Sequence, residues 1–325
     1  MTLFSNLILV ALGLLGLYFG GELLVTGASR IARRLGLSSL LIGLTIVAVG
    51  TSTPELFVSI WSALRGASGI SLGNVIGSNI ANIGLILGLT GIVATVTVHR
   101  NLVRREVPIL IFVTIFTTLL MLDGELSRLD GILLLMGFIG FNGVFYWLSR
   151  RDVDDQADEN LAEEETEDDV SSLWQPAFQV VGGIVLLLIG ANLMVEGAAN
   201  MARAVGVSET VIGLTMVAFG TSLPELATSM TAAVKKEADI AIGNIIGSNV
   251  ANLLLVLGAT TAIQPINISG ASLTLLEPLV MIGFTVMLVP FVRNRVLATR
   301  ESAMFLGAYL AFVIYSFLVS MAMPT

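Results

Sequence analysis

The sequence contains no cysteine and only one histidine in 325 residues. Without cysteine the chain can form neither a disulfide framework nor a thiolate metal site. The single histidine, His99, lies in a basic segment between apolar runs, so a site built from histidine ligands is not expected either. The H-E-x-x-H and G-x-S-x-G motifs of hydrolases are also missing. An enzyme is therefore the weakest of the functional classes considered.

Charged residues are scarce as well, at 12% of the chain, whereas hydrophobic residues make up 55%. With a mean hydropathy of +0.91, a soluble globule would expose far too much apolar surface. The apolar runs are long enough to cross a bilayer as helices, and they do not alternate as the strands of a β-barrel would. The first run, from Leu3 to Leu24, has no basic segment before it and is interpreted as a retained helix rather than a signal peptide.

The apolar runs predict an all-α membrane protein with ten transmembrane helices. They span residues 4–32, 38–64, 71–96, 103–122, 128–149, 174–203, 208–234, 240–262, 272–292 and 301–321. When the connecting segments are assigned alternately to two sides, thirteen basic residues fall on one side and three, Arg65, Arg128 and Arg203, on the other. The basic side is cytoplasmic by the positive-inside rule. We therefore expect a multi-pass protein of the cell membrane with both termini outside.

One segment concentrates negative charge. Between Asp152 and Asp169 lie eleven of the 24 acidic residues, and without them the net charge of −8 would be +3. A segment so acidic and free of aromatic residues cannot bury enough apolar surface to fold by itself. Residues 150–172 are predicted to form a cytoplasmic linker between two halves of the chain, 1–149 and 173–325. The alternative is a calcium-sensing or partner-binding tail, but the segment lacks the spacing of an EF-hand.

The two halves carry matching segments. Residues 43–59 (GLTIVAVGTSTPELFVS) and 213–229 (GLTMVAFGTSLPELATS) are identical at 12 of 17 positions, and residues 73–88 and 243–258 at 11 of 16, with the same offset of 170. Each half holds five predicted helices, so the second must enter the membrane from the opposite face. Such inverted repeats are typical of secondary transporters with a site near the midplane. We expect the site where the second and third helices of both halves meet.

Each half also has a proline inside a predicted membrane helix. Pro54 and Pro224 have no N–H to donate to the carbonyl one turn earlier, at Gly50 and Gly220, so both helices should kink or break near mid-membrane. An unpaired carbonyl is costly in lipid unless it lines a cavity or meets another partner. A cation is such a partner, and the freed carbonyls are candidate ligands.

Oxygen-bearing side chains gather around these prolines. In each half a threonine lies four residues before a glutamate and a serine four residues before an asparagine, so each pair shares a helix face. These residues are Thr51, Glu55, Ser78, Asn82, Thr221, Glu225, Ser248 and Asn252. Carboxylate, hydroxyl, amide and carbonyl oxygens suit hard cations such as Na⁺ and Ca²⁺. A duplicated glutamate inside the membrane indicates function, because burying a carboxylate there costs about 2.5 kcal/mol or more.

GTSTPEL and GTSLPEL, each followed by GNxxGSNxAN, resemble the two α-repeats of the calcium/cation antiporter superfamily, in particular its sodium/calcium exchangers. The resemblance implies that Glu55 and Glu225 bind calcium, and that hydroxyl groups supply further oxygens to sodium and calcium. The hydroxyl groups are those of Thr51, Ser52, Ser78, Thr221, Ser222 and Ser248. The carbonyls of Ala48 and Ala218 would add to them. It also implies that helices 1 and 6 slide across the other eight to open the site alternately to each side.

Asn252 bears on the type of exchanger. Some members of the superfamily have aspartate there, and in the potassium-dependent branch that aspartate is associated with potassium transport. Here Asn252 and Asn82 are both neutral, so two site carboxylates remain. We therefore expect the potassium-independent type, with Na⁺, Ca²⁺ and the bilayer as its partners, no cofactor, no nucleic acid, and function as a monomer. Glu22 and Glu196, on helices 1 and 6, are not repeat equivalents; they either line the access routes or reach the membrane interface, and we favour the interface.

The coupling ion has two candidates. Two protons would neutralise two carboxylates as well as one Ca²⁺ does, so a calcium/proton antiporter is the alternative. The neutral oxygens can coordinate more than two monovalent ions, and the family resemblance implies three Na⁺. Three Na⁺ against one Ca²⁺ moves one net charge per cycle, so we expect electrogenic exchange. A cation channel could use the same oxygens, but inverted repeats favour alternating access.

Overall fold

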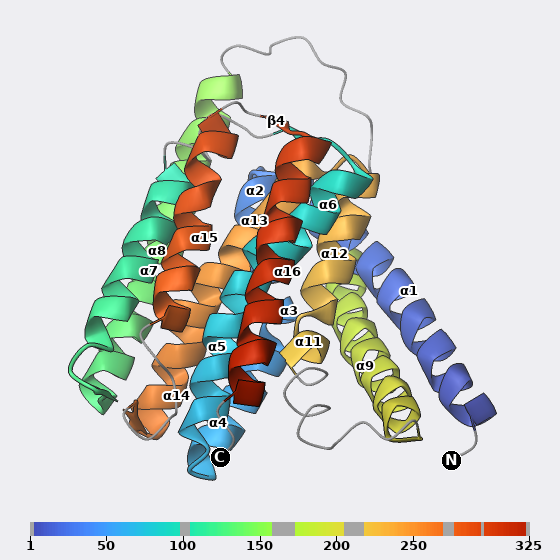
Figure 1. Cartoon of the computed structure of the whole chain (residues 1–325). Coiled ribbons are helices and arrows are strands. Elements are labelled where there is room, and N and C mark those ends of the chain that lie inside the picture. The colour runs from blue at the N-terminus through green and yellow to red at the C-terminus, as the bar shows by residue number, and fades with distance from the viewer. Residues whose placement is uncertain are drawn as a thin grey trace.

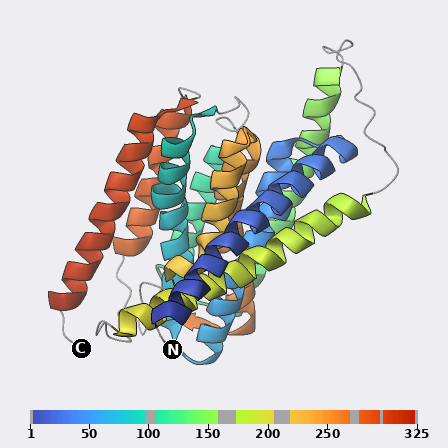
Figure 2. The same cartoon turned by 90° about the vertical axis from the view of Figure 1, so that its right-hand side faces the viewer.

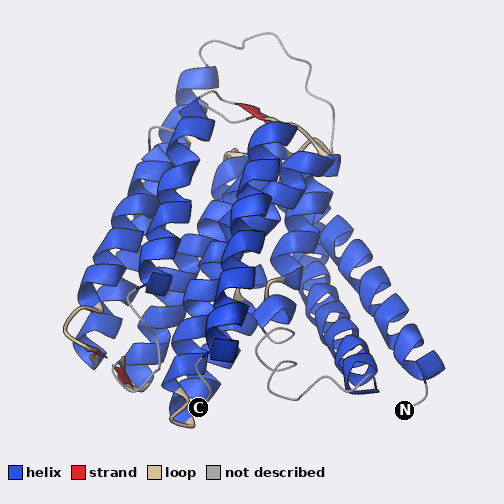
Figure 3. Cartoon of the chain, in the orientation of Figure 1, coloured by secondary structure: helices blue, strands red, loops and turns tan. Residues whose placement is uncertain are grey.

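The computed structural model describes residues 3–97, 105–157, 173–204, 218–268, 276–293 and 296–322. Almost all of this part of the chain is helical (Figure 3). The first half contains α1 (Leu3–Leu35), α2 (Ser39–Ile42), α3 (Ala48–Thr51), α4 (Thr53–Leu64), α5 (Ser68–Ala81), α6 (Gly88–Val93), α7 (Val107–Leu120) and α8 (Arg128–Ala157). The second half contains α9 (Trp174–Ala204), α11 (Ala218–Thr221), α12 (Leu223–Val234), α13 (Ala238–Val250), α14 (Leu257–Ile263), α15 (Leu276–Arg293) and α16 (Thr299–Ala322). Three π-helical segments whose bounds lie within the described residues continue these helices, η1 (Gly43–Val47), η2 (Asn82–Leu87) and η5 (Ala251–Val256), and Arg105 and Glu106 directly before α7 are π-helical as well.

Helix is present at each of the ten predicted spans, although part of the span 208–234 lies outside the described residues. In the described chain, five helices are long and apolar enough to cross a membrane, and a bent pair makes a sixth span. The helices α7 and α15 are apolar but shorter. The protein is thus a multi-pass helical membrane protein, and the number of ten spans stays a prediction. The helix α8 differs from its predicted end at 149, because it continues to Ala157.

The helices α1 and α9 form an antiparallel pair on one side of the molecule (Figures 1 and 2). Glycines let the two backbones touch, since a Cβ on Gly16 would lie 2.9 Å from the Cα of Gly190, and one on Gly183 would lie 2.6 Å from the backbone nitrogen of Leu24. Small residues at a helix interface allow this close approach in membranes. The first helix of each half therefore packs mainly against its counterpart.

Short strands join the two halves. The strand β1 (Val96–Thr97) pairs antiparallel with β4 (Val296–Leu297), and β2 (Glu125–Leu126) pairs with β3 (Ile266–Asn267). Each sheet therefore combines one strand from either half, and the two sheets lie at opposite ends of the molecule (Figure 3). The strand β3 begins at the position that the sequence repeat assigns to β1. In an inverted repeat, equivalent strands of the two halves are expected at opposite ends of the molecule, as β1 and β3 are here.

The chain ends follow the alternation predicted from the basic residues. The helix α1 begins and α16 ends at the same end of the molecule, whereas α8 ends and α9 begins at the opposite end (Figures 1 and 2). Residues 158–172, which hold most of the acidic segment, lie outside the described residues. The elements on both sides of that segment are at the end opposite both termini.

Candidate ion-binding site

Both proline-containing helices are broken where the sequence predicts. Ser52, with φ −78° and ψ 9°, separates α3 from α4, and the helical segments on either side are bent by 45°. Ser222, with φ −88° and ψ 4°, separates α11 from α12. Pro54 and Pro224 then occupy the first turn of α4 and α12, where a missing N–H leaves no helical hydrogen bond unmade. The prolines thus begin new helices inside the membrane.

The two glutamates follow these breaks and exchange hydrogen bonds across the halves. Glu55 and Glu225 each lie in the first turn of the new helix, where the helix dipole favours a negative charge. The Oγ of Ser52 donates to Oε1 of Glu225 over 3.1 Å, and the Oγ of Ser222 donates to Oε1 of Glu55 over 3.3 Å. Both glutamates are completely buried. The two breaks therefore form one polar centre.

The second oxygen of each carboxylate is left over. Oε2 of Glu55 and Oε2 of Glu225 are buried without a hydrogen-bond partner among the described residues. A buried carboxylate oxygen is strongly destabilising unless something compensates its charge. A hard cation between the two carboxylates would do so, and this is the chemistry that the arrangement best accommodates.

Two asparagines outside the predicted set bind the helices that follow the breaks, α4 and α12. In the first half, Nδ2 of Asn74 donates to the backbone carbonyl of Glu55 over 3.1 Å and to Oγ of Ser59 over 2.9 Å. Asn244 makes the equivalent two bonds in the second half, over 3.3 and 2.9 Å. Each asparagine thus fixes the turn that carries the site glutamate.

The same asparagines also connect the halves. The Oγ1 of Thr51 donates to Oδ1 of Asn244 over 3.1 Å, and the Oγ1 of Thr221 donates to Oδ1 of Asn74 over 3.4 Å. A sequence signal for them existed, because Asn74 lies four residues before Ser78 in the duplicated GNxxGSNxAN motif and so shares its helix face. They orient the threonines that the sequence analysis assigned to the site.

The predicted residues of the third helix in each half line the same centre. Ser78 lies 3.4 Å from Ser222, and Ser248 lies 3.4 Å from Thr51, measured between hydroxyl oxygens. Asn82 and Asn252 are buried one turn further on, where the π-helical segments η2 and η5 lie. Their Oδ1 atoms have no hydrogen-bond partner among the described residues. Single π-helical turns of this kind often occur at functional sites.

The structure gives less support to the two alanines that were expected to offer carbonyl oxygens. The carbonyl of Ala48 accepts hydrogen bonds from the backbone nitrogen of Ser52 over 3.0 Å and from Oγ1 of Thr51 over 3.3 Å. It is therefore already engaged within its own helix. Ala218 is the first residue of α11, and the residues directly before it lie outside the described part of the chain. A ligand role for either carbonyl stays a prediction.

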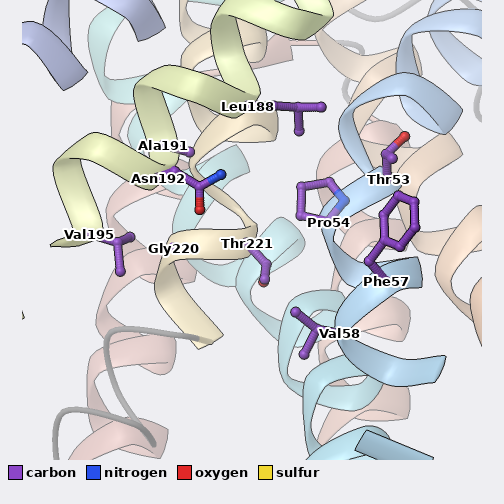
Figure 4. A pocket seen from close by; sticks show the side chains of 10 residues that line it. All are labelled: Thr53, Pro54, Phe57, Val58, Leu188, Ala191, Asn192, Val195, Gly220 and Thr221. Carbon is purple, nitrogen blue, oxygen red and sulfur yellow. The ribbon is translucent and has the colours of Figure 1, made fainter. Parts of the chain in front are cut away.

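A cavity of about 360 Å³ lies beside the site (Figure 4). It lies between α4 and α9 beside α11, and Thr221 forms part of its wall together with Pro54, Val58 and Asn192. From the break at Ser52, α4 runs toward the end of the molecule where α1 begins (Figure 1), and the cavity is lined by its first turns, so the cavity lies on that side of the break. The counterparts of Pro54 and Val58 in the second half, Pro224 and Thr228, are buried. Within the described residues, the two sides of the site are thus covered unequally.

Comparisons with known proteins agree with this architecture. A family model described as sodium/calcium exchanger protein matches residues 5–147 and 176–318, one segment in each half. The chain is 43% identical to the putative antiporter CaxA of Alkalimonas amylolytica, over 82% of this chain and 83% of the relative. It is 32% identical to the sodium/calcium exchanger MaX1 of Methanosarcina acetivorans, over 97% of this chain and 99% of the relative.

A solved structure extends the match to three dimensions. The sodium-calcium exchanger NCX_Mj, soaked with 10 mM Na⁺ and zero Ca²⁺, superposes with a TM-score of 0.83 at 32% identity. The match covers 96% of this chain and 99% of that one. Exchangers of this family are transporters rather than enzymes. The chain belongs to the sodium/calcium exchanger family, within the calcium/cation antiporter superfamily.

Proposed function

We propose that the protein exchanges Na⁺ for Ca²⁺ across the membrane by alternating access. The observation that carries the proposal is the pair of buried carboxylates, Glu55 and Glu225, each bonded through one oxygen to a serine of the opposite half. The other oxygen of each has no partner among the described residues. Membership of a family whose relatives are named sodium/calcium exchangers supports the choice of ions.

In this proposal the two carboxylates bind Ca²⁺, and the neutral oxygens around them complete the sites for both ions. The neutral oxygens belong to Thr51, Ser52, Ser78, Asn82, Thr221, Ser222, Ser248 and Asn252 and to the carbonyls of Ala48 and Ala218. Ca²⁺ takes six to eight oxygen ligands, more than two carboxylates supply. Within the described chain, no three histidine, cysteine, aspartate or glutamate side chains gather in one place. The remaining ligands would therefore be hydroxyl, amide and carbonyl oxygens.

The neutral oxygens around the two carboxylates favour unequal exchange, because they can coordinate more than two monovalent ions. Two ionised glutamates give the empty site a charge near −2, which one Ca²⁺ neutralises, so the loaded site can cross the low-dielectric interior. Three Na⁺ in its place would carry one net charge more. We infer a stoichiometry of three Na⁺ to one Ca²⁺ and electrogenic transport, in which each cycle gains or loses about 2.3 kcal/mol per 100 mV. Neutral Asn82 and Asn252 fit an exchanger that does not need K⁺.

The same proposal includes an orientation and an organisation. Both termini would lie outside, the acidic linker 150–172 in the cytoplasm, and each half, 1–149 and 173–325, would form one five-helix repeat. The location of α1 and α16 ends opposite the α8–α9 connection supports this alternation (Figure 1). Because the site lies within a single chain, one copy would suffice for transport.

A calcium/proton antiporter and a channel are the competing functions. Uptake of radiolabelled Ca²⁺ into proteoliposomes loaded with Na⁺, compared with K⁺ loading and with an imposed pH gradient, separates them. The proposal predicts uptake only from Na⁺-loaded vesicles. Uptake driven by the pH gradient without Na⁺ would point to proton coupling. Non-saturating Ca²⁺ flux that needs no ion on the far side would indicate a channel.

A further inference from the structure

Side-chain contacts fasten α1 to the turn between α12 and α13. The Nζ of Lys235 lies 2.6 Å from Oε2 of Glu22 and donates a hydrogen bond to Oγ1 of Thr26 over 2.8 Å. One turn further along α1, the Oγ of Ser29 donates to Oε1 of Glu237 over 2.7 Å. Lys235 caps the end of α12 and Glu237 caps the start of α13. The contacts therefore join the α1/α9 pair to the part of the molecule that carries the site.

The other half has no matching set of contacts in the described chain. By the repeat offset of 170, the counterparts of Lys235, Glu22 and Thr26 are Arg65, Asn192 and Glu196. Arg65 caps the end of α4, as Lys235 caps that of α12, but its guanidinium carbon lies 4.6 Å from the ring centre of Trp61 instead of meeting a carboxylate of α9. Glu196 is exposed. Arg65 and Glu196 have the charges needed for a second ion pair, but they do not form one in this structure.

This asymmetry coincides with the asymmetry of access. Arg65 caps the end of α4, which lies at the end of the molecule where α1 begins (Figure 1), and Glu196 follows Val195, which lines the cavity between α4 and α9. Lys235 caps the end of α12, which lies at the opposite end of the molecule (Figure 1), and Pro224 and Thr228 in the first turns of α12 are buried. The ion pair is thus formed on the closed side of the site and absent on the open side.

We propose that Glu22 and Lys235 form a latch that keeps the site closed at the end where α12 stops, and that Arg65 and Glu196 form the opposite latch when the site opens the other way. The inference rests on the proposed alternating access. In the repeat, Glu196 occupies the place of Thr26, the residue that already contacts Lys235 through a hydroxyl group. Moving the α1/α9 pair would therefore bring Glu196 to Arg65 while it withdraws Glu22 from Lys235.

The latch is suited to switching because it is weak. The side chains of Lys235 and Glu22 are 28% and 36% exposed, so their pairing should favour one state over the other by only about two- to fivefold. A stronger lock would trap the carrier in one state, since ligands shift an equilibrium only by their differential affinity. If the Glu22–Lys235 pair is replaced by a similarly weak Glu196–Arg65 pair, the two access states stay close in free energy.

Thiol labelling tests the latch, because the chain has no native cysteine. In proteoliposomes of known orientation, single Val58→Cys and Thr228→Cys variants are labelled with a membrane-impermeant maleimide from the side toward which each residue would open. Adding Glu22→Gln or Lys235→Gln should slow labelling of the Val58→Cys variant by about two- to fivefold and speed labelling of the Thr228→Cys variant comparably. Glu196→Gln should shift both rates in the opposite direction, and the exposed Glu125→Gln should change neither.

A charge exchange guards against a folding artefact. The double variant Glu22→Lys with Lys235→Glu should restore the parental labelling rates, which simple damage to the fold would not. If Glu22→Gln leaves both rates unchanged while Na⁺ and Ca²⁺ still shift them in the parent, the latch is wrong and alternating access stands. If the maleimide never labels the Thr228→Cys variant from its side of the membrane, whatever the Na⁺ and Ca²⁺ concentrations, alternating access is wrong. The proposed function and the latch then both fail.

Discussion

The Oγ of Ser52 donates a hydrogen bond to Oε1 of Glu225 over 3.1 Å, although the two residues are 173 positions apart. The reciprocal bond, from Ser222 to Glu55, closes the pair. Each half of the chain therefore supplies one glutamate and the hydroxyl group that bonds to the glutamate of the other half. Neither half can build the candidate site alone, and a change in one half should be felt at the carboxylate of the other.

Replacing either glutamate should nearly abolish Ca²⁺ transport. Glu55→Gln or Glu225→Gln keeps the size of the side chain but removes one negative charge from a buried cation site. Losing one partner of a buried charge interaction costs about 3–5 kcal/mol, enough for a fall of more than a hundredfold in Ca²⁺ uptake. The measurement is Na⁺-driven uptake of radiolabelled Ca²⁺ at matched protein levels.

The matched control for this pair is Glu125→Gln, an exposed glutamate in β2 that lies in neither repeat motif. It should leave uptake unchanged. Substantial uptake by either site variant at normal expression would show that Ca²⁺ binds elsewhere.

The hydrogen bonds from Ser52 to Glu225 and from Ser222 to Glu55 should contribute about equally to Ca²⁺ affinity. Ser52→Ala and Ser222→Ala each remove a hydrogen bond to a buried carboxylate, and such bonds are worth about 1.5–3 kcal/mol. We expect the apparent Ca²⁺ affinity to fall by roughly ten- to a hundredfold in both variants. Ser302→Ala is the control, because Ser302 is buried too but bonds back to Ala298 of its own segment over 3.0 Å. A loss confined to one of the two site serines would contradict the symmetric arrangement.

Asn74 and Asn244 should prove structural as well as functional. Asn244→Ala leaves the carbonyl of Glu225 without its side-chain donor, and an unsatisfied buried group costs about 1–3 kcal/mol. Both the melting temperature in detergent and the rate of Ca²⁺ uptake should fall. Asn142→Ala should lower neither, since Asn142 only bonds back to Phe138 in α8. If Asn244→Ala lowered uptake without lowering the melting temperature, the asparagine would act on the ions and not on the helix break.

Adjacent glycines of α9 offer a matched test of the α1/α9 packing. A Cβ on Gly183 would lie 2.6 Å from the backbone nitrogen of Leu24, whereas a Cβ on Gly182 would meet nothing within 4 Å. Gly183→Ala should therefore destabilise the protein by about 1–3 kcal/mol, as overpacking does, while Gly182→Ala should be neutral or slightly stabilising. Thermal unfolding of the two variants in the same detergent measures the difference. Equal behaviour would mean that α1 and α9 are not packed this closely.

Much of the fold could be predicted from the sequence because its signals are local. The apolar runs gave helix at every predicted span, and Pro54 and Pro224 marked both breaks. Periodicity could not show that α8 continues to Ala157, since its last residues are polar and belong to the acidic segment. The pairing of β1 with β4 was also hidden, because two-residue strands have no pattern of their own.

The residues of the candidate site could be predicted from the sequence, but the hydrogen bonds between them could not. The duplicated motifs identified Glu55, Glu225 and their hydroxyl neighbours, because each motif lies on one helix. Which serine meets which glutamate depends on how the halves meet in space, and spacing along the chain says nothing about that. The ion pair of Glu22 with Lys235 is hidden for the same reason. The sequence alone favoured the membrane interface for Glu22, with an access route as the alternative.

The most direct test of the account is a paired measurement of Na⁺ efflux and Ca²⁺ uptake in proteoliposomes whose membrane potential is set with K⁺ and valinomycin. The account predicts about three Na⁺ released for each Ca²⁺ taken up, faster uptake at an inside-positive potential, slower uptake at an inside-negative one, and loss of both fluxes in Glu225→Gln. Ca²⁺ uptake that ignores the potential and follows a pH gradient in the absence of Na⁺ would contradict it.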